Sequence, residues 1–147
     1  MHNRLATTLE TLIADLDAEI TAYEATQQQQ TSKAILICSH AAPLIALGRV
    51  LTGRMPKDSG EEDFNVFTAG LSTFVRRSTS NGSSYKGHIG HDDDKQSIEP
   101  LLAPGTKPLR PGMKVPEWEG GKGVGGGWDC VRNGDCSFLS GGAERGW

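Results

Sequence analysis

The fold expected of this sequence depends on the stretch AILICSHAAPLIALGR, residues 34–49. Its first five residues are all apolar, without the polar alternation of a half-exposed strand, which is typical of a strand buried on both faces. Pro43 fits the first turn of a helix whose apolar residues continue to a stop at Gly53. We therefore expect a buried strand at 34–38, a short loop, and a helix from Pro43 to about Leu51, the pattern of an α/β sheet.

A second helix is expected upstream, over residues 4–26. Apolar side chains recur there every three or four residues, apart from one adjacent pair, and form the stripe of an amphipathic helix. They are Leu5, Leu9, Leu12, Ile13, Leu16, Ile20 and Tyr23. Asn3 is a suitable N-cap for this helix.

The later part of the chain predicts short strands and loops. A strand is expected at 71–75, and Asn133-Gly134 predicts a two-residue hairpin turn between strands at 128–132 and 135–139. Of the 19 glycines, 12 lie between Gly105 and Gly146. We therefore divide the chain into an α/β part (1–77), a flexible Gly/Pro-rich excursion (78–122) and a C-terminal hairpin region (123–147).

Composition excludes several classes of protein. The 147 residues carry a formal net charge of −3 and a pI near 5.8, which argues against a nucleic-acid backbone as the main partner. No apolar run is long enough to cross a membrane, and no secretory signal is present. Three cysteines expected to be unpaired fit a reducing compartment, so we expect a cytoplasmic or nuclear protein.

The candidate site lies at His40, in the loop between the expected strand and helix. Ligands of open α/β sheets bind at the carboxyl ends of strands, and a helix N-terminus attracts anions. The small Ala41 leaves room for a phosphate to approach the backbone. His40 and Ala41 are therefore candidate phosphate-binding residues; the alternative is that His40 merely caps the loop.

Residues 34–49 resemble the second histidine motif of the histidine phosphatase superfamily, which has the phosphoglycerate mutase-like fold. Residues 71–77 and the tail from Gly127 onward are similar to later segments of a fungal branch of that family. The resemblance implies a three-layer α/β/α sandwich, of which this chain would be the C-terminal half. It also implies hydrolysis of a phosphorylated small molecule or phosphoprotein through a phosphohistidine, without a cofactor or metal. His40 would be the catalytic histidine that binds the transferring phosphoryl group together with two arginines.

The nucleophilic motif of that family, Arg-His-Gly, does not occur in this sequence. We therefore expect a truncated histidine phosphatase-like chain without turnover of its own. The alternative is a non-catalytic interaction module, because a phosphatase-like domain of related fungal proteins is a subunit of the RNA polymerase III initiation factor assembly. Half a sheet would leave an exposed edge, which could bind a protein partner.

Three further patterns are weaker. Residues 121–126 fit G-x-G-x-x-G but follow no expected strand, so a flexible loop is the better interpretation than a nucleotide site. His88, His91 and Asp92–Asp94 have no metal-ligand spacing, so they predict a solvated loop. Arg76 and Arg77 could replace the missing arginines, although a solvated surface pair is the more ordinary explanation.

Overall fold

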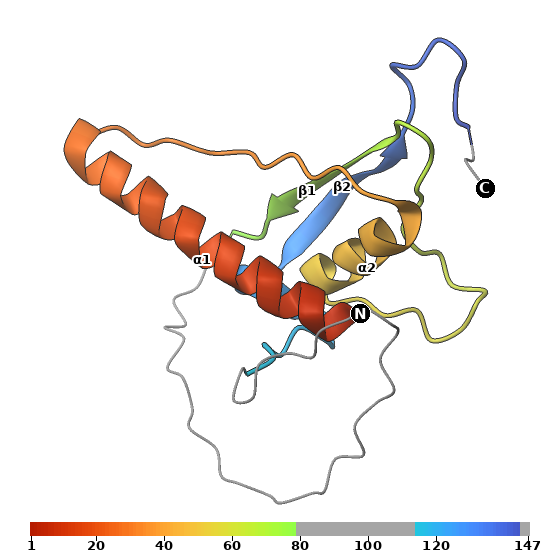
Figure 1. Cartoon of the computed structure of the whole chain (residues 1–147), viewed down its shortest axis with the longest axis horizontal. Coiled ribbons are helices and arrows are strands. Elements are labelled where there is room, and N and C mark those ends of the chain that lie inside the picture. The colour runs from red at the N-terminus through yellow and green to blue at the C-terminus, as the bar shows by residue number, and fades with distance from the viewer. Residues whose placement is uncertain (79–113, 145–147) are drawn as a thin grey trace, which may run out of the picture. The chain divides into compact units, whose positions relative to one another are not determined.

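The computed structural model describes residues 1–78 and 114–144, which have a mixed α/β architecture (Figure 1). In chain order, its elements are α1 (His2–Gln27), α2 (Ala41–Thr52), β1 (Leu71–Arg76), the short 3-10 turn η1 (Val124–Gly126) and β2 (Trp128–Asp135). Met1–Arg77 and the described residues from Lys114 onward belong to one compact unit. The two parts of the chain on either side of residues 79–113 therefore share one core.

Helix α1 confirms the expected amphipathic stripe, but only its first half is buried. Ala6, Leu9 and Ile13 are buried, whereas Tyr23, three turns later, is 51% exposed. The helix begins at His2 with Met1 as its N-cap, so Asn3 lies inside the helix. No helix of the described residues is long and apolar enough to cross a membrane.

Helix α2 confirms the helix expected after Pro43. It ends where predicted, because Gly53 adopts a left-handed conformation (φ 75°) and its N–H donates to the carbonyl of Arg49 at 2.8 Å. A Cβ atom at Gly48 would lie 2.6 Å from the ring of Phe64. Glycine at this position therefore lets the segment that follows α2 fold back tightly against the helix.

The two strands form an antiparallel pair, and one face of this sheet packs on the core. Strand β1 confirms the strand expected at 71–75, and its Phe74 lies opposite Cys130 of β2. Phe74 and Trp128 pack against the buried cluster, whereas Val75 and Val131 are more than half exposed. The other face of the sheet therefore presents apolar side chains to solvent.

The predicted hairpin at Asn133-Gly134 is wrong. These residues lie inside β2, which continues through them and pairs with β1 more than fifty residues upstream. The register advances from Leu71–Asp135 to Thr73–Arg132, so β2 carries one extra residue there, a β-bulge. Gly134 has φ 67° and its N–H donates to Ser72 Oγ. The left-handed conformation of Gly134 therefore belongs to a β-bulge and not to the predicted turn. Both structures need a residue with positive φ, so the same glycine fits either.

The predicted buried strand at 34–38 is also wrong. These residues form no strand, and Ile35, Leu36 and Ile37 are 47%, 77% and 40% exposed. Cys38 is exposed as well; all three cysteines are free, as expected. A buried strand needs neighbours on both edges and both faces, and the only strands among the described residues pair with each other.

The core is completed by residues from the late, glycine-rich part of the chain. Trp118 and Val124 are 3% and 1% exposed. Among the described residues, the buried cluster consists of Ala6, Leu9, Ile13, Val50, Leu51, Trp118 and Val124. Residues 114–122, which were expected to belong to a flexible excursion, therefore contribute Trp118 to the core. Residues 79–113 of the expected excursion lie outside the described residues.

Replacing Val50 with alanine should destabilise the protein by about 2 kcal/mol, because Val50 is fully buried between α1 and the late segment. The matched control is Val131→Ala, whose side chain is 57% exposed and whose loss should change stability by less than about 0.5 kcal/mol. Urea unfolding followed by circular dichroism measures both. Equal effects of the two substitutions would contradict this core.

Candidate functional site

His40 occupies the N-cap position of α2 and its side chain is exposed. Its backbone is extended (φ −88°, ψ 167°), and its carbonyl accepts the first helical hydrogen bond from Leu44 at 3.1 Å. The imidazole makes no capping hydrogen bond. The side chain of His40 is therefore accessible to a ligand. The alternative, that its ring caps the loop by a hydrogen bond, is wrong.

The start of α2 has the ordinary electrostatics of a helix N-terminus. Ala41 and Ala42 are small and no acidic residue lies in the first turn. Unpaired N–H groups and the helix dipole favour an anion there. The sequence thus placed His40 and Ala41 correctly at a helix start, although the buried strand that should precede them is absent.

Arg77, one of the two arginines considered as a phosphate clamp, lies at the other end of α2 from His40. The Nη2 group of Arg77 donates to the carbonyl of Thr52, the last residue of the helix, at 3.1 Å. A helix of twelve residues spans about 18 Å. Arg77 and His40 therefore cannot hold one phosphoryl group together.

Arg77 instead joins three segments of the structure. Its guanidinium also donates to the carbonyl of Gly121 at 2.6 Å and that of Trp128 at 3.0 Å, and its Nε pairs with Asp129 at 2.8 Å. Each of these carbonyls needs a donor, and arginine supplies several from one planar group. Arg77 is a structural residue.

Arg76 is occupied in a similar way. Its guanidinium pairs with Asp17 of α1 at 2.7 Å and donates from Nε to the carbonyl of Gly125 at 2.8 Å. It also lies over the ring of Trp128, 5.9 Å from the centroid. The pair is therefore neither a substrate clamp nor merely solvated, because both arginines bind other parts of the fold.

The G-x-G-x-x-G pattern at 121–126 is a packing loop. The N–H of Gly121 donates to the carbonyl of Gly53, that of Gly123 to the carbonyl of Trp118, and that of Gly125 to Glu10 of α1. A Cβ atom on Gly123 would lie 2.1 Å from the carbonyl oxygen of Leu51. These glycines thus allow close approach to α2, and the three N–H groups are unavailable to a phosphate.

Metal-ligating residues do not cluster in the part of the chain that the structure describes, which holds no group of three or more His, Cys, Asp or Glu side chains arranged for an ion. His88, His91 and Asp92–Asp94 lie outside the described residues.

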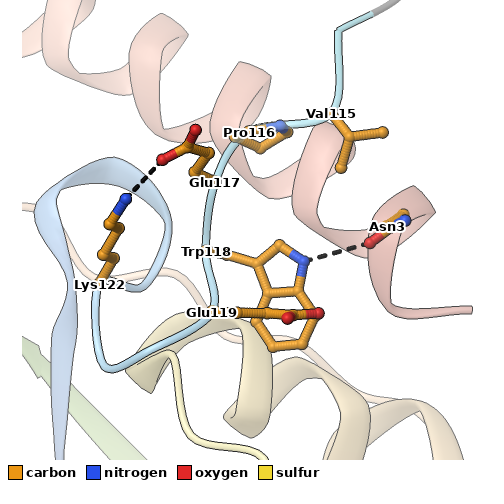
Figure 2. A pocket seen from close by; sticks show the side chains of 7 residues that line it. All are labelled: Asn3, Val115, Pro116, Glu117, Trp118, Glu119 and Lys122. Atoms are coloured by element: carbon orange, nitrogen blue, oxygen red, sulfur yellow. Dashed lines mark hydrogen bonds and ion pairs between the residues drawn. The ribbon is translucent and has the colours of Figure 1, made fainter.

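A cluster that the sequence reasoning missed joins the start of α1 to the late segment. The ring of His2 stacks on that of Trp118, with centroids 5.6 Å apart and planes 18° from parallel. The indole N–H of Trp118 donates to Asn3 Oδ1 at 3.2 Å (Figure 2). Nη1 of Arg49 lies 3.5 Å from Nε2 of His2. No sequence pattern indicates this cluster, because His2 and Trp118 lie more than a hundred positions apart.

Arg49 is held in this cluster by Asp63. Its Nε lies 3.1 and 3.3 Å from the two carboxylate oxygens, and its Nη2 also pairs with the carboxylate. Burial opposes ionisation of Asp63, but hydrogen bonds from Arg49 and Phe64 outweigh it and lower the pKa of this carboxyl. The pKa of His2 is lowered, first by burial and then by the charge of Arg49.

A cavity of about 310 Å³ adjoins the same tryptophan. Figure 2 shows the lining side chains, among them the indole bonded to Asn3 and the ion pair between Glu117 and Lys122. Its lining residues are Asn3, Val115, Pro116, Glu117, Trp118, Glu119 and Lys122. In this wall, Glu117 is paired with Lys122 and the indole N–H of Trp118 is already bonded to Asn3.

A second cavity, of about 250 Å³, contains Cys130 and Asn133. Burial raises the pKa of the Cys130 thiol, so the thiolate that would act as a nucleophile is disfavoured. Asn133 is bound on both sides, because its amide donates to the carbonyl of Asp63 and accepts from the N–H of Asn65. Neither Cys130 nor Asn133 is therefore activated for chemistry in this cavity.

No protein-family model, curated protein or solved structure matches this chain. Its function has to be inferred from its own geometry and from the resemblance of its motifs.

Replacing Arg77 with lysine should destabilise the protein by about 2 kcal/mol, since one ammonium cannot serve Thr52, Gly121, Trp128 and Asp129 together. Arg132→Lys is the control, because this guanidinium is 61% exposed and contacts Asp135 at 3.4 Å. Chemical denaturation compares the two variants. If Arg77→Lys is as stable as the control, the hydrogen bonds of Arg77 do not contribute to the stability of the fold.

Proposed function

We propose that this chain is a non-catalytic protein-interaction module related to the histidine phosphatases. The observation that carries the proposal is the exposed apolar run Ile35-Leu36-Ile37, which the core does not use. In the three-layer α/β/α sandwich of the complete family, neighbouring strands and helices would cover such a run. Here a partner protein provides that cover.

The chemistry of the segment fits a partner that contributes a β-strand. Residues 34–38 form neither a helix nor a strand, so their backbone groups are available to a neighbouring strand edge. Burying apolar side chains contributes about 25 cal/mol per Å², and Leu36 alone is 77% exposed. Val75 and Val131 are further exposed apolar side chains, on the outer face of the sheet.

A role within a multiprotein assembly follows from this surface. The resemblance points to an assembly of the RNA polymerase III initiation factor kind, in which a phosphatase-like domain binds other subunits. The net charge of −3 favours protein contacts over direct nucleic-acid binding. A cytoplasmic or nuclear location accords with this role.

The arrangement of charged groups supports the absence of turnover. Phosphoryl transfer needs a nucleophile, a leaving-group acid and cations around the phosphoryl oxygens. His40 is a single imidazole, and Arg49, Arg76 and Arg77 are engaged elsewhere in the described structure. One positioning group alone has little transition state to stabilise.

A second candidate is phosphoester hydrolysis by a complete histidine phosphatase of which this chain supplies His40 and Ala41. The observation in its favour is the free imidazole of His40 at the start of α2, where no acidic side chain competes for the helix N-terminus. The substrate would be a phosphorylated small molecule or a phosphoprotein.

Hydrolysis of p-nitrophenyl phosphate by the purified chain tests the absence of turnover. We expect the purified chain and its His40→Ala variant to release p-nitrophenol at the same background rate, because the sequence lacks the nucleophilic Arg-His-Gly motif. Turnover that the wild-type chain shows and His40→Ala loses would reject the non-catalytic proposal and favour the second candidate.

The double substitution Ile35→Ser/Leu36→Ser should change stability by less than about 0.5 kcal/mol, because these side chains lie outside the core. It should also lower the fluorescence of bound 8-anilinonaphthalene-1-sulfonate and any self-association seen by sedimentation velocity, since both depend on exposed apolar surface. The matched control is Gln29→Ser/Gln30→Ser, on the same connection. A loss of more than about 2 kcal/mol would place the segment in the core and remove the basis of the proposal.

A further inference from the structure

The first turn of α1 holds the Trp118 segment by two contacts. His2 stacks on the indole face, and Asn3 accepts the indole N–H. Trp118 itself is 3% exposed and belongs to the core cluster. Residues that are more than a hundred positions apart in the sequence therefore meet at one aromatic pair.

The contact between His2 and Arg49 requires a neutral imidazole. A guanidinium only donates hydrogen bonds, so Nε2 of His2, 3.5 Å from Nη1 of Arg49, can take part only as an acceptor. The ring proton then resides on Nδ1. Protonation of Nε2 would set an N–H against an N–H and a positive charge against another.

Arg49 cannot readily turn away from an imidazolium. Asp63 holds its guanidinium through Nε and Nη2, and Arg49 belongs to α2, which contributes Val50 and Leu51 to the core. The repulsion between a protonated His2 and Arg49 would instead be relieved by movement of the His2 ring. Because this ring stacks on Trp118, the movement would weaken the contact with the indole.

We propose that His2 is a pH-sensitive clamp, which fixes the Trp118 segment against α1 and α2 while the imidazole is neutral and loosens it when the imidazole is protonated. This device is independent of the proposed interaction surface at 34–38. It would regulate the accessibility of Trp118 and of the cavity beside it.

Charged groups from every neighbouring element act on His2. The α-amino group of Met1 and Arg49 of α2 oppose its protonation, as does burial, whereas Glu119 of the Trp118 segment and Asp63 favour it. The opposing effects prevail, and the pKa of His2 lies below the usual 6.5. The clamp is therefore complete above about pH 6.5, and its contribution is lost as the pH falls from there through the lowered pKa.

The test follows the indole of Trp118 in the full chain labelled with 5-fluorotryptophan, by ¹⁹F NMR between pH 7.5 and 5, with Trp118→Phe to assign its resonance. We compare the wild type with His2→Gln, which can still accept a hydrogen bond from Arg49 but does not titrate. His40→Gln is the matched control, an exposed histidine without a side-chain cap bond.

We expect the Trp118 resonance to move with a midpoint below pH 6.5 in the wild type and in His40→Gln, and to stay fixed in His2→Gln. The same titration in His2→Gln would overturn the proposal. If His2→Gln does not fold, the pH titration of the His2 Cε1 proton resonance in the wild type is measured instead. A titration midpoint that coincides with that of Trp118 supports the clamp, and a midpoint at 6.5 or above rejects it.

Discussion

The guanidinium of Arg77 joins the parts of the chain that lie on either side of residues 79–113. It donates to carbonyls at the end of α2, in the glycine loop and at the start of β2. These carbonyls occur where regular structure stops, so no helix or sheet bond satisfies them. With Arg77 in place, the glycine loop can pass close to α2 and deliver Trp118 and Val124 to the core.

This arrangement explains why an apolar stretch can remain exposed. The late segment packs Trp118 and Val124 against α1 and α2, so the core closes without Ile35, Leu36 and Ile37. The exposed stretch leads directly into His40 and α2. Arg76 and Arg77 hold other segments of the fold together.

Much of the helical structure could be predicted, because its signals are local. The three- to four-residue spacing in α1 and the glycine after α2 each act within one or two turns. The position of His40 at a helix start followed from the same signals. The cluster of His2, Arg49 and Trp118 could not be predicted, because its residues are 47 or more positions apart in the sequence. Periodic patterns indicate local structure and not contacts over this separation.

The sequence by itself determined the two helices and the strand at β1, whereas the strand predicted at 34–38 and the turn predicted at Asn133-Gly134 are wrong. Only the tertiary structure decided which extended segments pair, so that β2 runs through Asn133-Gly134 to meet β1 while 34–38 stays unpaired. The reason is the location of the hydrogen bonds. A helix satisfies its backbone within itself, whereas a strand depends on a neighbour, and the packing of the whole chain determines which neighbour is available.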